Sequence, residues 1–399
     1  MVTNAPLIEL DPSSSLAASE PLSSFIFKVA TRCNLDCSYC YEYNMGDDSW
    51  KRQPHYMQLD TVRMLAERIK EHALTHGLDF IAFSFHGGEP LLAGTEFFCQ
   101  AVKTIRHVLG DKIGSSFGVQ TNGTLITEEI VQLFSQQRIH IGLSLDGPKE
   151  INDRRRIHAS GRGSFDDVMH GIRWLSTPEG REVFSGVLCV IDHEADPLEV
   201  FEFLTSLPTP SIDFLLPHGN WSSLPAGKTD PETTTYADWL IQIFDTWFDG
   251  KHSDVAIRTF EEIIEYRLGG KGHLETLGLS PVSLICIAAD GSIESVDTMK
   301  SVFPGAHQLH MDVFHHSFDD VLKHPLVHAR QVGLRALCER CVNCPLVATC
   351  GGGYFPHRWS SINQFRNPSV YCADYIKLIT HICRRVDHEL TTGDTNGSC

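Results

Sequence analysis

Six short apolar runs alternate with helix-length segments between Phe25 and Pro217, and this alternation restricts the fold more than any other feature of the sequence. The runs are rich in β-branched or aromatic residues and read FIFKVA from Phe25, FIAFSFHG from Phe80, SFGVQTNG from Ser116, HIGLSLDG from His140, VFSGVLCVI from Val183 and SIDFLLP from Ser211. Between them, apolar residues recur at helical spacing, as at Leu59, Val62 and Leu65. Strands that alternate with amphipathic helices predict right-handed parallel βαβ units. We therefore expect an α/β fold based on a partial (β/α)6 TIM barrel.

Polar or glycine-rich clusters follow four of these predicted strands. They are Cys33 to Cys40, His86 to Pro90, Gln120 to Gly123 and Ser144 to Gly147. Any one cluster is explained by ordinary turn formation. In a parallel barrel, however, the strand ends meet at one rim, where active sites are built. Four such clusters on one rim predict a shared pocket.

Charge and composition exclude several function classes. The 399 residues include 33 Lys and Arg against 50 Asp and Glu, a net charge of −17, which disfavours binding to nucleic acid. No run approaches the ~20 apolar residues of a membrane span, and no positive charge precedes Lys28. We predict a cytoplasmic protein with a disordered tail over residues 1–24, a barrel over 25–275 and a smaller unit over 276–399. Within the last unit, a hairpin around Gly291 and a final helix over 374–390 are expected.

The cysteines are clustered, which indicates metal ligands more than disulfides in a reducing cytoplasm. Cys33, Cys37 and Cys40 form CxxxCxxC directly after the first predicted strand. Three thiolates hold three irons of a cubane cluster and leave the fourth iron open for chemistry. A zinc ion with His55 or His86 as the fourth ligand is the alternative. Isolated cysteines elsewhere are predicted to be buried apolar residues.

The segment CNLDCSYCY, with Tyr39 before the third cysteine, resembles the signature of the radical S-adenosylmethionine (SAM) enzymes. This resemblance implies a partial barrel, a [4Fe-4S] cluster on Cys33, Cys37 and Cys40, and cleavage of SAM to a 5′-deoxyadenosyl radical. It also implies the SAM-binding residues. They are Gly87 and Gly88, whose backbone approaches the methionine part, Glu89 on the ammonium group, Gln120, Asn122 and Ser144 on the ribose or carboxylate, and Arg156 on a carboxylate. For Arg156, a solvated charge is the alternative.

A second cysteine group near the C-terminus consists of Cys341, Cys344, Cys350 and Cys372. Its spacing fits a zinc ribbon or an iron–sulfur site. Beside the first motif, it resembles the SPASM extension of peptide-modifying radical SAM enzymes, which implies one auxiliary [4Fe-4S] cluster on these four residues. Tyr354 and Val296 stand where a second auxiliary cluster would have cysteines. Cys286 and Cys338 remain available for a degenerate second site.

The segments DGSIESVDTMK, DVFHHSFDD, CGGGYFPHRW and NPSVYCADY together resemble the FxsB-type maturases. This resemblance implies a cyclophane crosslink between an aromatic ring and a Cβ atom in a ribosomally made precursor peptide, with reduced flavodoxin or ferredoxin as electron donor. Asp297 resembles the Asp that follows a cluster cysteine in sulfatase-maturing enzymes, which implies that it is the catalytic base, although a turn carboxylate is the alternative. His357 and Arg358 are further candidates for substrate contact or packing of the cysteine loop. Formylglycine formation in sulfatases and a non-catalytic electron carrier are the rival functions.

Overall fold

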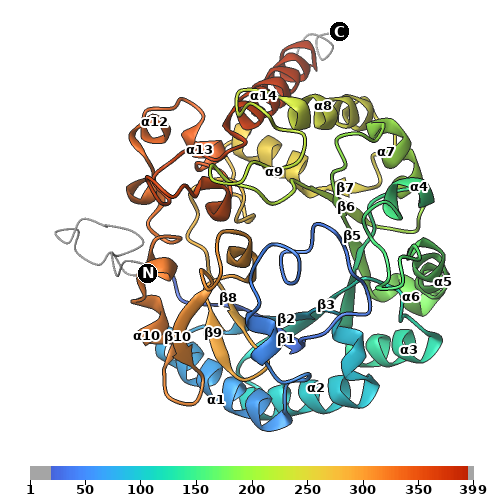
Figure 1. Cartoon of the computed structure of the whole chain (residues 1–399), viewed down its shortest axis with the longest axis vertical. Helices are drawn as coiled ribbons and strands as arrows, with labels where there is room; N and C mark the ends of the chain where they lie inside the picture. The colour runs from blue at the N-terminus through green and yellow to red at the C-terminus, as the bar shows by residue number, and fades with distance from the viewer. Residues whose placement is uncertain (1–18, 394–399) are drawn as a thin grey trace.

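The computed structural model describes residues 19–393, which form one ten-stranded sheet with helices around its outer face (Figure 1). The strand order is β10-β9-β8-β1-β2-β3-β4-β5-β6-β7. The strands are β1 (Ser24–Ala30), β2 (Phe80–Gly87), β3 (Gly114–Thr121), β4 (Ile139–Ser144), β5 (Phe184–Val190), β6 (Ser211–Leu215), β7 (Ala256–Ile257), β8 (Leu284–Ile287), β9 (Ser292–Glu294) and β10 (Gln308–Asp312).

The helices mostly connect consecutive strands. The α-helices are α1 (Leu59–His76), α2 (Thr95–Leu109), α3 (Glu128–Gln137), α4 (Lys149–Asn152), α5 (Phe165–Leu175), α6 (Pro178–Val183), α7 (Pro197–Thr205), α8 (Thr235–Phe248), α9 (Arg258–Arg267), α10 (Phe318–Leu322), α11 (Pro325–His328), α12 (Glu339–Val342), α13 (Val347–Cys350) and α14 (Cys372–Gly393). Short 3₁₀ helices are η1 (Ser49–Arg52), η2 (Pro90–Ala93), η3 (Asp297–Ser301), η4 (Gly333–Ala336) and η5 (Phe355–Arg358). No helix in this described range has the length and apolar character needed to cross a bilayer.

Strands β1 to β6 pair in parallel and in chain order, which confirms the predicted partial barrel. The outer face of the sheet carries aromatic rings that pack under the helices. The ring centroids of Phe83 and Phe117 are 5.2 Å apart and stacked, and Phe85 meets Phe98 of α2 edge-on at 5.3 Å. This face forms the hydrophobic core between sheet and helices.

The opposite face of each strand points into the barrel because side chains alternate along a strand. While Phe83 and Phe85 face the helices, His86 of β2 belongs to the inner set and is paired in register with Lys28 of β1. By the same alternation, Gln120 of β3 and Ser144 of β4 lie on the inner face. Four polar side chains from four adjacent strands therefore share the barrel interior.

The C-terminal segment continues the same sheet. Strand β8 pairs in parallel with β1, from Ser24 beside Leu284 to Phe27 beside Ile287, and β8 and β9 form the predicted hairpin at Gly291. Helix α14, which starts at Cys372, packs on α8 and α9. The boundary predicted after residue 275 thus does not coincide with any break in the sheet.

The predicted tail over residues 1–24 lies largely outside the described residues, and its last part is ordered. The side chain of Leu22 is fully buried, and its backbone N–H donates to Nε2 of His72 at 3.0 Å. The N–H of Ser23 donates to the carbonyl oxygen of Ser283 at 3.0 Å. Burial of Leu22 in the core extends the folded unit past the predicted boundary at Phe25.

Candidate active site

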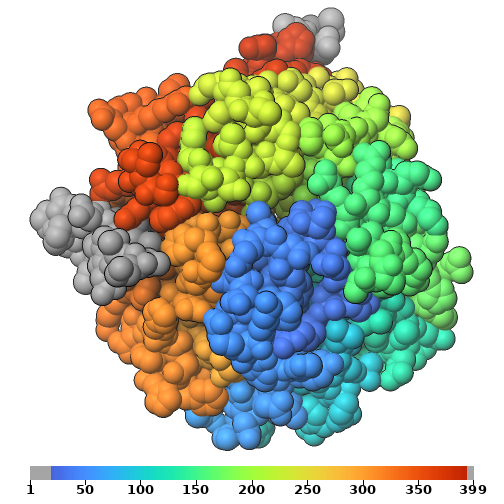
Figure 2. Space-filling view, in the orientation of Figure 1, coloured from blue at the N-terminus to red at the C-terminus, as the bar shows by residue number. Residues whose placement is uncertain are grey.

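A cavity of about 460 Å³ occupies the inner side of the barrel, at the ends of the strands. Its wall includes most of the residues that the sequence predicts for the site: Cys33, Cys37, Tyr39, Cys40, Gly87, Gly88, Gln120, Asn122, Ser144 and Arg156. The loop that follows β1 lies over the mouth of the barrel (Figure 1). Figure 2 shows this blue segment at the centre of one face, between the orange C-terminal segment and the green middle of the chain. The four predicted clusters therefore do share one pocket.

Cys33, Cys37 and Cys40 present partly buried thiols to this cavity. Burial raises the pKa of Cys33 to about 11 and that of Cys40 to about 12, so the free thiols stay protonated at neutral pH. Iron bound to all three would stabilise the thiolates and offset this effect of burial. Sγ of Cys33 accepts hydrogen bonds from the N–H of Leu35 at 3.4 Å and from Nδ2 of Asn122 at 3.7 Å. Such donors also stabilise sulfur ligands of a cluster.

The distances between possible ligand atoms bear on the alternative of a zinc ion with His55 or His86 as the fourth ligand. Tetrahedral zinc with Zn–S bonds near 2.3 Å places its ligand atoms about 3.8 Å apart. Between residues 19 and 393, no set of three metal-ligand atoms that includes a cysteine lies within 4.8 Å of one another, with His55 and His86 counted as partners. Among the described residues, these thiols therefore form no preformed zinc site, and a cubane cluster on them stays a prediction.

Tyr39 connects the cysteine loop to the end of β4. Its hydroxyl donates to Oδ2 of Asp146 at 2.5 Å and accepts from Nη1 of Arg156 at 2.7 Å. The Arg156 side chain is buried, which excludes a solvated charge, and its Nε has no hydrogen-bond partner among the described residues. Since a buried unpaired donor is costly, Arg156 is suited to hold a carboxylate in the cavity.

Glu89 lies beneath the cavity wall and is fully buried. Its Oε1 accepts from the N–H of Leu91 at 2.9 Å and from Oγ1 of Thr121 at 2.7 Å, and its Oε2 accepts from the N–H of Asn122 at 2.8 Å. Glu89 therefore holds the ends of β2 and β3 together. A contact with an ammonium group of SAM remains a prediction that would use its remaining acceptor capacity.

Gly87 and Gly88 are required for a reason that the sequence did not indicate. A Cβ atom on Gly87, whose φ is +140°, would lie 2.1 Å from the carbonyl oxygen of Ala30. One on Gly88 would lie 1.9 Å from the hydroxyl oxygen of Tyr43. Both glycines allow the loop after β1 to pack against the end of β2. They also line the cavity, as predicted.

Gln120 and Asn122 build the next part of the wall. Nε2 of Gln120 donates to Oγ of Ser144 at 2.9 Å, across from β3 to β4. Asn122 donates to Oδ1 of Asn34 at 2.9 Å, which ties the end of β3 to the cysteine loop. The structure thus brings both residues and Ser144 to the cavity, while their contacts with a cofactor stay predictions.

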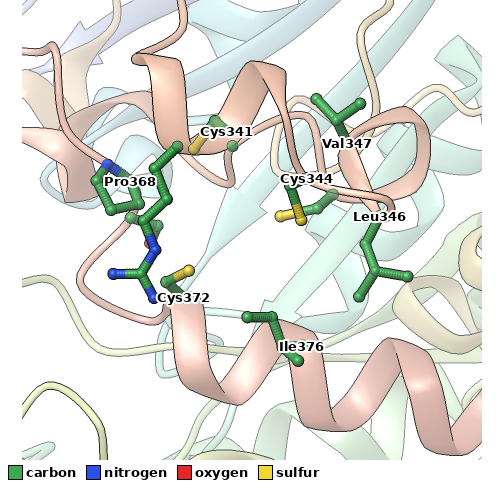
Figure 3. Close-up of a pocket in the computed structure, with 11 residues that line it drawn as sticks. Cys341, Cys344, Leu346, Val347, Pro368, Cys372 and Ile376 are labelled. Atoms are coloured by element: carbon green, nitrogen blue, oxygen red, sulfur yellow. The ribbon is translucent and has the colours of Figure 1, made fainter.

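The C-terminal cysteines form a separate group. Cys341 of α12, Cys344, Cys350 at the end of α13 and Cys372 at the start of α14 line one small cavity. Figure 3 shows the sulfur atoms of Cys341, Cys344 and Cys372 around a common space. Arg358 donates to the carbonyl oxygens of Gly351 and Gly353, at 2.8 and 2.5 Å, and so packs the loop beside this group. The four cysteines thus line a common space, and an iron–sulfur cluster on them stays a prediction.

Asp297 is buried behind the cavity wall instead of lining it. Its Oδ2 accepts from the hydroxyl of Tyr41 at 3.0 Å and lies 3.9 Å from Nζ of Lys28, and its Oδ1 accepts from the N–H of Thr298 at 2.9 Å. Burial alone would raise the pKa of Asp297, but Lys28 and His86 outweigh it and lower the pKa to about 2. Its direct action as a base on a substrate stays a prediction.

Four aromatic side chains form a wall that sequence reasoning largely missed. The rings of Tyr41, His218, Tyr354 and His357 contact one another edge-on or tilted and line the cavity. Burial lowers the pKa of His218 to about 4 and that of His357 well below its ordinary value, so both are neutral at pH 7. His218 comes directly after the segment LLP at the end of β6, and this position at a strand end was the only sign in the sequence that it lies at the site.

Comparison with known proteins finds similarity over the barrel. Residues 27–204 match the radical SAM superfamily. The serine-type anaerobic sulfatase-maturating enzyme of Bacteroides thetaiotaomicron is 25% identical over 390 residues, which cover 92% of this chain and 91% of that enzyme. The cysteine-type enzyme of Clostridium novyi is 28% identical over 290 residues, or 69% of this chain and 73% of that enzyme.

Two solved structures share the fold. Native anSMEcpe with bound AdoMet has a TM-score of 0.78 at 23% identity and covers 92% of this chain and 99% of its own. Streptococcus suis SuiB bound to precursor peptide SuiA has a TM-score of 0.57 at 16% identity, over 89% of this chain and 76% of its own.

Over residues 27–204, the chain is similar to the radical SAM enzymes. The superfamily match runs from β1 into α7 and includes the cysteine loop and the Gly87 to Glu89 segment. This similarity implies a [4Fe-4S] cluster and SAM as cofactors, and the three thiols and the unpaired Nε of Arg156 fit them. These matches do not distinguish the FxsB-type maturases from other radical SAM enzymes, so that assignment remains a prediction.

Proposed function

We propose that this enzyme forms an aryl-to-Cβ crosslink, a cyclophane, in a ribosomally made precursor peptide. The observation that supports this best is the position of the aromatic wall, Tyr41, His218, Tyr354 and His357, in the same cavity as Cys33, Cys37 and Cys40. Such a wall can pack edge-on against an aromatic ring of the substrate peptide, and a cyclophane crosslink requires an aromatic side chain. The neutral imidazoles add hydrogen-bonding groups without charge.

The known residues of the barrel have distinct tasks in this reaction. A [4Fe-4S] cluster with SAM supplies the hydrogen-abstracting 5′-deoxyadenosyl radical when bound to Cys33, Cys37 and Cys40. Arg156 and Tyr39 orient the carboxylate of the cofactor, and Asn122 donates to the sulfur of Cys33.

A peptide substrate is supported by proteins of the same fold. SuiB has been solved with its precursor peptide SuiA, and native anSMEcpe with AdoMet and the Kp18Cys peptide. Because both share the barrel, the same inner cavity is the expected peptide site here. Reduced flavodoxin or ferredoxin is the proposed electron donor.

The proposed crosslink is an oxidation that removes two hydrogens from the peptide. One hydrogen atom leaves a Cβ atom, a carbon–carbon bond forms to the aromatic ring two residues earlier, and the ring then loses one proton and one electron. An auxiliary [4Fe-4S] cluster on Cys341, Cys344, Cys350 and Cys372 is the proposed acceptor of that electron. Val296 is buried, and Tyr354 is hydrogen-bonded to Thr298, so both predicted second-cluster positions are filled by packed side chains.

Formylglycine formation is the second candidate, because anaerobic sulfatase-maturating enzymes are similar to this chain over most of its length. In that reaction a Cys or Ser side chain is oxidised to an aldehyde. The two products differ chemically, so one experiment separates them.

The test offers two synthetic peptide panels to the reconstituted, dithionite-reduced enzyme with SAM. One panel carries aromatic-x-x motifs near the C-terminus, and the other carries Cys or Ser in place of the aromatic residue. We expect 5′-deoxyadenosine together with an aromatic peptide that is lighter by two hydrogens and carries a new aryl–carbon bond by NMR. An aldehyde that reacts with a hydrazide, formed only from the Cys or Ser panel, would instead establish formylglycine formation.

A further inference from the structure

His86 occupies a position between the cavity and the buried carboxylate of Asp297. It lies on the inner face of β2, lines the cavity, and keeps 23% of its side chain exposed. Its Nδ1 is buried, has no hydrogen-bond partner, and lies 3.4 Å from Oδ2 of Asp297. A small rotation of the ring would close this contact into a hydrogen bond, and such contacts are often long before substrate binds.

Asp297 itself is poorly placed to take a proton from a substrate. Asp297 does not line the cavity, whereas its neighbours Tyr41, His86 and Thr298 do. Its Oδ2 already accepts from Tyr41 and faces Lys28, so the carboxylate has its charge compensated where it stands. A carboxylate behind an imidazole can nevertheless fix the tautomer of the ring and stabilise the imidazolium form.

We propose that His86 is the general base of this enzyme and that Asp297 is its positioning residue. The Nδ1–H of His86 faces Asp297, which leaves Nε2 as the basic nitrogen toward the cavity. This proposal rests on the proposed function, because it concerns the proton that the substrate loses during oxidation. It replaces direct proton transfer to Asp297 with transfer to the imidazole in front of it.

The other cavity histidines lack this arrangement. His357 is buried and His218 is partly buried, both among aromatic rings, and no carboxylate lies within ion-pair distance of either in the described part of the chain. Burial lowers the pKa of His218 to about 4 and outweighs the charge of Asp297, which raises that pKa. Of the three histidines on the wall, only His86 combines exposure to the cavity with a carboxylate partner.

The charges around His86 come from every element packed near it. They are Lys28 of β1, Glu42 and Tyr41 of the cysteine loop, Glu294 of β9, Asp297 and Lys300 of η3, and His218 after β6. Lys28 and Lys300 are each paired with Glu42 and Glu294. Asp297 is the carboxylate within 4 Å of the His86 ring nitrogens.

The proton transfer balances as a simple acid–base step. After hydrogen abstraction and ring closure, the C–H bond at the attacked ring carbon breaks, and its proton moves to Nε2 of His86. The electron pair of that bond restores the aromatic ring, from which one electron passes to an oxidised iron–sulfur cluster. His86 becomes an imidazolium ion paired with the Asp297 carboxylate, and it releases its proton to solvent when product leaves.

The first test needs no substrate. Reconstituted holoenzyme is labelled with diethyl pyrocarbonate over a range of pH, and modification of His86, which requires the neutral imidazole, is followed by mass spectrometry. Asp297→Asn removes the charge that stabilises imidazolium, so we expect the midpoint of His86 labelling to shift about tenfold or more toward higher proton concentration. Asp297→Glu keeps the charge, so its labelling midpoint should lie close to that of the wild type. Equal midpoints in wild type and Asp297→Asn would overturn the pairing.

The second test uses the aromatic-x-x peptide that wild-type holoenzyme converts. In His86→Gln, 5′-deoxyadenosine formation should continue, while crosslinked product falls about 10²- to 10⁴-fold, as for a lost general base. His140→Gln is the matched control, because His140 is exposed and outside the cavity wall. Crosslinking at the wild-type rate in His86→Gln would exclude the base role. If wild type converts no peptide of either panel, the proposed function fails, whereas the labelling result still decides the pairing.

Discussion

Arg156 illustrates how burial determines the role of a single residue. In the sequence it is one of three consecutive arginines, and a solvated charge is an equal interpretation. In the fold, the neighbouring Arg154 pairs with Asp192 and stays 46% exposed, whereas Arg156 is buried on the cavity wall with Nε unpaired. Only the tertiary structure separates the two residues.

Replacing Arg156 with Lys should weaken the binding of SAM. A lysine keeps the charge but lacks the planar set of donors, so one charge-assisted hydrogen bond is lost. We expect affinity to fall by about 10- to 100-fold, measured by equilibrium dialysis of SAM with reconstituted protein. Arg154→Lys is the control and should bind like wild type. Equal affinities for both variants would show that Arg156 does not contact the cofactor.

Gly88 provides a second prediction at the residue scale. Its replacement by Ala places a Cβ atom 1.9 Å from the hydroxyl oxygen of Tyr43 and 2.5 Å from the carbonyl oxygen of Arg32. The loop after β1 must move, which should lower the free energy of unfolding by about 1–3 kcal/mol in urea titrations. Gly118→Ala, with its nearest heavy atom at 3.8 Å, should show no such loss. Similar stability of both variants would contradict the packing argument.

At the scale of elements, the two cysteine groups lie on different kinds of secondary structure. Cys33, Cys37 and Cys40 occupy the loop after β1, where Asn34, Asn122 and Tyr39 hold it to neighbouring strands. The C-terminal group joins two single-turn helices to the first residue of the long helix α14. Since no hydrogen bond links the two groups among the described residues, they should load with iron independently.

Replacing Cys33, Cys37 and Cys40 together by Ala should abolish 5′-deoxyadenosine formation and leave iron in the C-terminal group. Wild-type protein should contain about eight irons after reconstitution, because each cubane cluster holds four. The triple variant should contain about four, measured by a ferrozine assay. Residual SAM cleavage would contradict the assignment of these ligands. A wild-type content near twelve would show that Cys286 and Cys338 bind a further cluster.

At the scale of the whole molecule, one sheet and one buried charge network join the two ends of the chain. The network links Lys28, Glu42, Glu294 and Lys300, and all four side chains are almost fully buried. Nζ of Lys300 lies 2.7 Å from Oε2 of Glu42, which connects η3 of the C-terminal segment to the cysteine loop. The loop is therefore held in place by residues from beyond the barrel.

Lys300→Met should destabilise the protein by about 3–5 kcal/mol at pH 7, because buried carboxylates lose a partner. Burial alone would raise the pKa of Glu294, but Lys28 and Lys300 outweigh it and lower the pKa below its ordinary value. A lowered pKa contributes stability above the unfolded-state value, and this contribution is lost as pH falls. The difference between wild type and variant, measured by urea unfolding, should thus shrink below about pH 4.5. A difference that is constant with pH would exclude the charge pairing as its cause.

A chain truncated after residue 275 should not remain a soluble monomer. Removal of β8 leaves the Ser24 to Phe27 edge of β1 without its partner, and unpaired edges associate. We expect aggregation in size-exclusion chromatography, with the full chain as control. A monomeric truncated chain that unfolds cooperatively would show that 25–275 is an independent domain.

The local sequence was sufficient for the barrel and for the residues on its rim. Strand and helix periods are properties of neighbouring residues, so the six runs predicted six parallel strands. Parallel strands end at one edge, so Cys33, Gly87, Gln120 and Ser144 were predicted to meet, and they do. The CxxxCxxC motif and the segment from Gly87 to Pro90 indicated the resemblance to radical SAM enzymes, because the residues of each motif are close together in the sequence.

Contacts between distant segments were decided only by the tertiary structure. Asp297 approaches His86 across more than 200 residues of chain, because β8 continues the barrel sheet past β1 and leads through β9 to η3, which starts at Asp297. Burial then determined which groups stay charged, how Arg156 differs from Arg154, and why Gly88 must be a glycine. Such effects depend on which atoms exclude water and fill space around a side chain, and this packing is a property of the whole fold.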